Sequence, residues 1–190
     1  MKVLFVSSTE KSESFIAEIL KGSPFERTAE ITIAKSAGEA RRICSDCEFD
    51  SVMINSPLSD EFGPELAYDL AEDSCSGIML LGRADVIDIL ENEAELHGVI
   101  VVHKPIQRSV IFQAMRSADV IRNRLLTMQK KNSELQKKLE ELRLVGKAKC
   151  LLVQFADMTE SDAHHYIEKE AMNNQVSRKL IAESIISIYS

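Results

Sequence analysis

The hydrophobic pattern of this chain is most regular between Ile111 and Leu142. Apolar residues recur there at alternating steps of three and four, the heptad spacing of a coiled-coil seam. We call these ten positions, of which nine are apolar and one is polar, the heptad ladder: Ile111, Ala114, Ala118, Ile121, Leu125, Met128, Asn132, Leu135, Leu139 and Leu142. Because neither Pro nor Gly interrupts this stretch, one long helix is predicted from about residue 107 to about residue 155. A lone helix cannot bury such a stripe, so the pattern predicts a partner helix.

The polar position in this ladder indicates how many helices pair. Asn132 occupies an a-type position among apolar neighbours, where a single Asn fixes the register and favours two strands. We therefore expect a coiled-coil linker at 107–142 and a homodimer. The predicted dimer seam consists of Ile121, Leu125, Met128, Asn132, Leu135, Leu139 and Leu142.

A different pattern precedes the ladder, with short apolar runs alternating with amphipathic stretches. The apolar runs predict strands at 3–7, 30–34, 51–55, 77–81 and 99–102. Amphipathic stretches between them predict helices at 10–21, 37–45, 61–71 and 84–93. Strict alternation of strand and helix implies an α/β fold, a five-stranded parallel doubly wound sheet with helices on both faces. We expect this domain to span 1–120.

After the heptad ladder, the pattern of residues 143–190 predicts a small three-helix bundle. The long helix breaks at 157–159, and Thr159 with Asp162 forms a capping-box-like start to a second helix. A third helix is predicted after Asn173-Asn174. Their apolar faces suggest that the three helices pack on one another.

Composition adds a charge asymmetry to this organisation. The chain has 190 residues and a net charge of −7. Residues 1–105 contain 9 Lys and Arg against 20 Asp and Glu, a net charge of −11, whereas residues 106–190 contain 14 against 10, or +4. Any polyanionic partner is therefore expected to meet the second part. Four cysteines without a signal-peptide pattern, and no membrane-length apolar run, predict a cytoplasmic protein.

The order of the first five strands, with Lys104-Pro105 after the last, resembles the receiver domain of two-component response regulators. That resemblance implies acidic Mg²⁺ ligands after the first strand, a phosphate-accepting Asp ending the third and a hydroxyl ending the fourth. Here these positions are occupied by Ser7 and Ser8, by Asn55 and by Gly82, and only Lys104 matches. An amide cannot form an acyl phosphate, and two hydroxyls cannot replace two carboxylates on Mg²⁺. The sequence predicts a pseudo-receiver with no metal and no cofactor.

The last part is similar to the ANTAR domain of AmiR- and NasR-type transcription antitermination regulators. The matching segments are Ala148-Lys149, Leu151-Leu152, 158–163, Ala171-Met172 and 178–182. Cys150, where a Gly is usual, and His164-His165 depart from the family pattern. The resemblance implies binding to paired stem-loops in nascent mRNA.

Six cations in this part are candidates for contacts to RNA phosphates. They are Arg143, Lys147, Lys149, Lys169, Arg178 and Lys179. Such side chains could form a cationic surface for a polyanion. From composition alone, solvated helix faces explain the same charges.

These observations favour a dimeric, RNA-binding antiterminator controlled by a partner protein or ligand instead of phosphorylation. Constitutive binding, with control at the level of expression, fits the same observations. The main alternative is an adaptor in which the pseudo-receiver and coiled coil only mediate protein association. DNA binding is a third option, although no convincing recognition helix is apparent. An enzyme is least favoured, because the catalytic positions of the resembled receiver are occupied by other residues.

Overall fold

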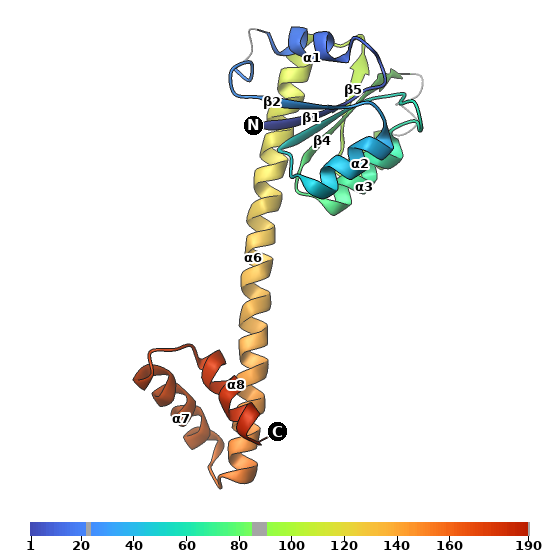
Figure 1. Cartoon of the computed structure of the whole chain (residues 1–190). Coiled ribbons are helices and arrows are strands. Elements are labelled where there is room, and N and C mark those ends of the chain that lie inside the picture. Colours follow the sequence, from blue (N-terminus) through green and yellow to red (C-terminus); the bar gives the residue numbers. More distant parts are fainter. Residues whose placement is uncertain (22–23, 85–90, 190) are drawn as a thin grey trace. The chain divides into compact units, whose positions relative to one another are not determined.

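The computed structural model describes residues 1–21, 24–84 and 91–189. Contacts between residues divide the chain into a first unit, Met1–Thr127, and a second unit, Met128–Ser190. The first unit is an α/β domain and the second is helical (Figure 1).

The first unit is built on a five-stranded parallel sheet, as predicted. Its strands are β1 (Lys2–Val6), β2 (Glu30–Ala34), β3 (Ser51–Asn55), β4 (Gly77–Arg83) and β5 (Ile100–Lys104), in the order β2-β1-β3-β4-β5. The strands β2 and β3 match the expected ranges, and β1, β4 and β5 differ from theirs by one or two residues at their ends. The central strands are buried on both faces, which explains their nearly continuous apolar sequences.

Helices cover both faces of this sheet (Figure 1). The helices are α1 (Ser12–Leu20), α2 (Ala37–Asp46), α3 (Pro64–Asp73), α5 (Glu91–Leu96) and the start of α6 (Arg108–Phe155). One core cluster joins the sheet to α2, α3 and α5, and the other joins it to α1 and α6. The helix expected at 84–93 lies largely outside the described residues.

The start of α6 corrects part of the interpretation of the heptad ladder. Ile111, Ala114 and Ala118, with Met115, are buried in the first unit's own core against α1 and the sheet. A Cβ atom on Gly77 would lie only 2.5 Å from Ala118 Cβ and 2.7 Å from its carbonyl oxygen. These first positions of the ladder are therefore covered by the same chain, and not by a partner helix.

An ion pair joins α6 to the edge of the sheet where the strands begin. The Arg122 guanidinium lies 2.6 Å from the Asp50 carboxylate. Asp50 also accepts a hydrogen bond of 2.7 Å from the backbone N–H of Lys2. Both side chains of the pair are about three-quarters buried, so Asp50 has a structural role at the opposite edge from Asn55.

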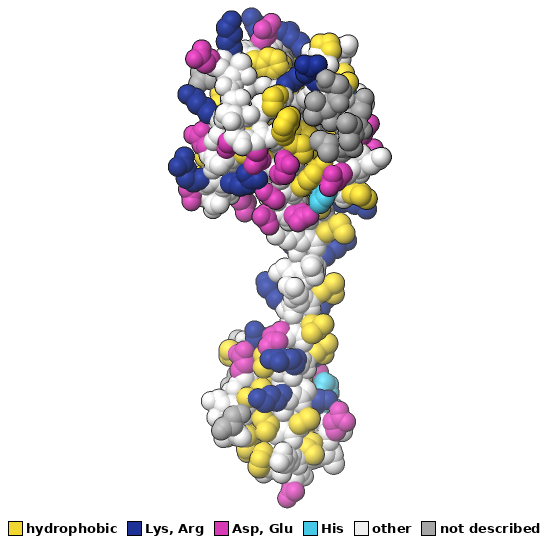
Figure 2. Space-filling view, turned by 90° about the vertical axis from the view of Figure 1, so that its right-hand side faces the viewer, with side chains coloured by type: hydrophobic (Ala, Val, Ile, Leu, Met, Phe, Trp, Pro, Cys, Tyr) yellow, Lys and Arg dark blue, Asp and Glu magenta, His cyan; other side chains and the backbone are white. Residues whose placement is uncertain are grey.

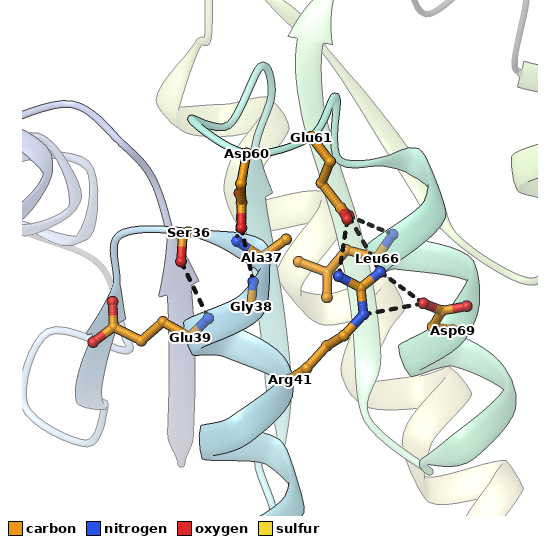
Figure 3. Close-up of polar contacts among 9 residues, drawn as sticks. All are labelled: Ser36, Ala37, Gly38, Glu39, Arg41, Asp60, Glu61, Leu66 and Asp69. Carbon is orange, nitrogen blue, oxygen red and sulfur yellow. Dashed lines mark hydrogen bonds and ion pairs between the residues drawn. The ribbon is translucent and has the colours of Figure 1, made fainter.

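Polar contacts also connect α2 and α3 (Figure 3). The Asp60 carboxylate accepts hydrogen bonds from the backbone N–H groups of Ala37 and Gly38, at 2.9 and 3.0 Å. Arg41 on α2 forms ion pairs with Glu61 at 2.9 Å and with Asp69 at 2.7 Å. These contacts satisfy otherwise orphaned donors at the start of α2 and fix the spacing of two helices.

In the second unit, the end of α6 packs with α7 (Glu160–Asn173) and α8 (Arg178–Tyr189). The Thr159 hydroxyl accepts a 3.1 Å hydrogen bond from the backbone N–H of Asp162, which confirms the predicted cap. The helix α6 continues through Gly146 without a break. The hydrophobic core of the second unit contains Val145, Ala148, Leu152, Ala163, Ile167, Ala182 and Ile185. Within the described part of the chain, no helix is long and apolar enough to span a membrane.

Candidate functional site

Three of the five receiver-like positions come together at the carboxyl edge of the sheet. Asn55 ends β3, Ser7 follows β1 and Lys104 ends β5. The Asn55 Nδ2 donates a 2.9 Å hydrogen bond to the Ser7 hydroxyl oxygen. The other amide atom, Asn55 Oδ1, is buried and has no hydrogen-bond partner in the structure described here.

Lys104 points into the same region. Its ammonium donates a 2.6 Å hydrogen bond to the carbonyl oxygen of Ser56, the residue after Asn55. Burial lowers the pKa of the Lys104 ammonium below its usual range. Among the described residues, no carboxylate forms an ion pair with Lys104.

The other two predicted positions lie at the same edge of the sheet but make different contacts. The exposed Ser8 hydroxyl donates to the Pro57 carbonyl at 3.4 Å. Gly82 is buried within β4, in register with His103 of β5. Neither residue lines the cavity beside Asn55.

The groups at this edge do not fit a receiver-type Mg²⁺ ion. Mg²⁺ is held in proteins by carboxylates, water and phosphate oxygens in an octahedral arrangement. Ser7 and Asn55 offer neutral oxygens, and Lys104 brings a positive charge. No cluster of three or more His, Cys, Asp or Glu suited to a metal occurs in the described residues.

A cavity of about 400 Å³ opens beside these three residues. Ser7, Asn55 and Lys104 form its polar wall, together with Thr9 and Lys11. Its apolar wall consists of Phe15 on α1 and of Pro105 and Ile106 behind β5. Lining by apolar side chains with a few convergent polar groups is typical of a small-molecule site.

In the second unit, four of the six predicted RNA-binding cations pair with carboxylates of the same chain. Lys149 lies 2.8 Å from Glu160, and the hydrogen bond lowers the pKa of the Glu160 carboxyl. Arg178 pairs with Glu141 at 3.0 Å and with Glu168 at 3.5 Å.

The remaining two pairs in this set are formed within single helices. Arg143 pairs with Glu140 at 3.2 Å, and Lys179 pairs with Glu183 at 3.7 Å. Lys147 and Lys169 are exposed, and neither has an ion pair within the described residues. These two lysines are thus the least compensated of the six candidates.

Counting charges over shorter ranges shows where the net charge of +4 in residues 106–190 lies. Residues 143–190 contain 6 Lys and Arg and 6 Asp and Glu, so the bundle is neutral. Residues 106–142 contain 8 and 4, and carry the entire excess of +4. The excess positive charge of the second part therefore belongs to the α6 helix before the bundle.

The predicted dimer seam remains uncovered along most of α6. Residues 123–139 are all exposed. The exposed fractions are 62% for Leu135, 69% for Leu139 and 71% for Leu142, and Leu125, Met128 and Asn132 are also exposed. Only Ile121 is half-buried among the seam residues. Figure 2 shows hydrophobic side chains at the surface of this helix, with Lys and Arg beside them.

Comparison with known protein families decides the nature of the second unit. Residues 133–186 match the family model of the ANTAR domain. The chain joins a receiver-like domain to an ANTAR domain. The match includes the end of α6 together with α7 and most of α8. All six candidate cations lie within the ANTAR domain.

Two characterised relatives are regulators. The chain is 25% identical over 171 residues to the transcriptional regulatory protein PdtaR of Mycobacterium tuberculosis, covering 90% of this chain and 82% of PdtaR. It is 29% identical over 94 residues to the aliphatic amidase regulator of Pseudomonas aeruginosa, covering 50% and 47% of the two chains. Neither relative is described as an enzyme.

Solved structures confirm the receiver fold of the first unit. The signal receiver domain of an HD domain-containing protein from Pseudomonas fluorescens superposes with a TM-score of 0.57 at 18% identity, covering 66% of this chain and 91% of that domain. A response regulator receiver domain from Clostridium thermocellum gives 0.54 at 19%, covering 66% and 98%. At these sequence identities the comparison supports the fold alone, and any chemical activity must be judged from the residues present at the site.

Four features of the structure were not predicted from the sequence. The unpartnered Asn55 Oδ1 and the cavity depend on side-chain positions, which no local pattern encodes. The ion pair between Arg122 and Asp50 joins residues 72 positions apart. The neutrality of the bundle, in contrast, could have been found by counting charges for each predicted domain.

Proposed function

We propose that this protein is an RNA-binding transcription antiterminator. As a homodimer in the cytoplasm, it would capture stem-loops in leader mRNA and would be regulated without phosphorylation of an Asp. The observation that carries the proposal is the ANTAR domain at residues 133–186. The regulators to which the chain is similar support the same class of function.

The dimer rests on the exposed stripe of α6. Leu135, Leu139 and Leu142 are more than half exposed at heptad spacing, and a second copy of the same helix would cover them. Asn132 lies in the same stripe and would pair with its counterpart in a two-stranded seam. Two linked ANTAR domains would hold two hairpins with higher avidity than one, through effective concentration.

Control without phosphorylation rests on the residues at the carboxyl edge of the sheet. Asn55 presents an amide where a nucleophilic carboxylate would be required, and Ser7 and Ser8 supply no acid for a metal. Incubation with acetyl phosphate and Mg²⁺ should leave the intact mass of the protein unchanged. Asn55→Asp should also remain unmodified, because the acidic metal ligands are still missing. Stoichiometric phosphorylation of the wild-type protein would contradict the proposal.

RNA binding is tested by titrating a two-hairpin RNA at several salt concentrations. Specific binding should weaken steeply with salt and depend on the sequence of the loops, where unpaired bases can be read. Lys149→Glu should weaken binding and leave helix content intact. Glu160→Gln is the matched control, because it breaks the same ion pair without adding negative charge. It should preserve or strengthen binding.

The two unpaired lysines sharpen the same experiment. Each phosphate contact that is removed should reduce the salt slope by about 1. Lys147→Gln and Lys169→Gln should therefore each flatten the slope if their ammonium groups contact phosphate. Lys2→Gln, at the start of β1 in the first unit, is the control and should leave the slope unchanged.

An adaptor that only mediates protein association is the second candidate. The neutral charge of residues 143–190 and the intramolecular pairing of four candidate cations favour it. An adaptor would remain dimeric and bind none of the hairpin RNAs at any salt concentration. Loop-dependent RNA binding would exclude this alternative.

A further inference from the structure

The cavity at the carboxyl edge of the sheet has a volume of about 400 Å³, which lies within the range of ligand sites. It lies in the first unit and involves none of the residues assigned to RNA or to the dimer seam. Its lining combines an apolar wall with two lysines and an amide.

The amide supplies one unsatisfied acceptor. Asn55 Nδ2 is bound to the Ser7 hydroxyl oxygen, but the buried Oδ1 of the same amide has no partner among the described residues. A buried polar atom without a hydrogen bond is unfavourable, because it has lost its contacts with water and gained none in return. A ligand with an N–H or O–H donor would remove that cost.

The lysines supply the charge. The Lys104 ammonium uses one of its three donors for the Ser56 carbonyl, and no described carboxylate neutralises it. Lys11 adds a second positive charge to the lining, to which no acidic residue contributes. The lining therefore favours an anion over a cation or a neutral molecule.

The apolar wall of the cavity indicates that most of the ligand is apolar. Phe15, Pro105 and Ile106 offer an apolar surface, which inorganic phosphate or acetate would leave uncovered. We propose that this cavity binds a small organic carboxylate with an apolar body and a hydrogen-bond donor. Its carboxylate would contact Lys104, and its donor would contact Asn55 Oδ1. The site goes beyond the proposed RNA function and is tested without RNA.

The test uses the full chain and three probes of this chemistry: indole-3-acetate, 4-hydroxyphenylacetate and 2-hydroxy-4-methylpentanoate. Binding is followed by calorimetry and by the NMR signals of Ile106 and of the amides around Asn55. At least one acid should bind with saturation and shift these signals. The corresponding primary amide, which lacks the charge, should bind at least tenfold more weakly, as should inorganic phosphate.

Variants connect binding to the named groups. Lys104→Met and Asn55→Leu should each weaken the best probe at least tenfold, and Lys2→Met, which alters a lysine at the opposite edge of the sheet, should leave it unchanged. If Lys104→Met loses the native amide spectrum, Asn55→Leu carries the test, because it keeps the bond from Lys104 to Ser56. The proposal is overturned if no acid shifts the site, if phosphate binds as tightly, or if the folded variants bind like the wild type.

Discussion

The two halves of the α6 ladder share one spacing but have different surroundings. In the first half, Ile111 and Ala118 are completely buried against the sheet of their own chain. In the second half, Leu135 and Leu139 remain more than 60% exposed. The comparison shows that a heptad pattern identifies a face that must be covered, but does not say what covers it. The first half is covered within the chain, whereas the second half is exposed, and we propose that a second copy of the chain covers it.

The largest effect is expected from a charge in the uncovered half. Leu135→Asp should dissociate the dimer, since burying a carboxylate in an apolar seam costs several kcal/mol. Sedimentation velocity should show a monomer, with the first unit still folded. Gln136→Asp, on the neighbouring exposed position, is the matched control and should remain dimeric. If Leu135→Asp had the same sedimentation coefficient as the wild type, the proposed dimer seam would be contradicted.

The covered half should respond in the opposite way. Ile111→Ala should lower the free energy of unfolding of the first unit by about 2 to 5 kcal/mol, because it leaves a cavity in a closed core. Chemical denaturation measures this loss. Sedimentation should still show a dimer at concentrations where the variant is folded. Loss of the dimer in a folded Ile111→Ala protein would mean that the two halves are not independent.

A smaller change tests how closely α6 approaches the sheet. Gly77→Ala would place a Cβ atom 2.5 Å from Ala118 Cβ and 2.8 Å from its carbonyl carbon, so the backbone must shift. Overpacking of this kind costs about 1 to 3 kcal/mol. The loss should appear in denaturation of the first unit. Gly98→Ala is a control of the opposite kind, because nothing lies within 4 Å of its added Cβ and only its positive φ adds strain.

The smallest expected effect concerns the polar contacts of α2, which packs in a different core cluster from the start of α6. Two backbone hydrogen bonds lower the pKa of Asp60 below its usual range. A carboxyl with a depressed pKa contributes stability above its unfolded value, near pH 4, and loses it as the pH falls through the folded value. Asp60→Asn should therefore show a shallower loss of Tm on acidification from pH 5 to about pH 2. If the Tm of the variant fell with decreasing pH as steeply as that of the wild type, this role of Asp60 would be contradicted.

Much of the fold was readable from the sequence, because its signals are local and repeated. The five buried strands are short apolar runs separated by turns, and each was placed within two residues. The helix start at Thr159 carries its own cap, so one side chain marked the boundary. The ANTAR resemblance likewise rested on residues with fixed helical spacing, and the family match includes them.

The candidate sites were readable only in part. Substitution of the receiver acids is a matter of residue identity, so Ser7 and Asn55 were evident from the sequence alone. The six cations were also visible, but the pairing of Lys149 with Glu160 and of Arg178 with Glu141 joins separate helices. Such pairing depends on how the side chains meet, and a count of charges along a segment cannot reveal it.

The sequence by itself determined the elements, the absence of an acidic receiver triad and the existence of an apolar stripe on α6. The tertiary structure decided which part of that stripe is already covered, and where a cavity remains beside Asn55 and Lys104. The physical reason is the range of the interactions. Periodicity and capping act between neighbours in sequence, whereas burial, ion pairing and cavity shape arise only when distant segments pack together.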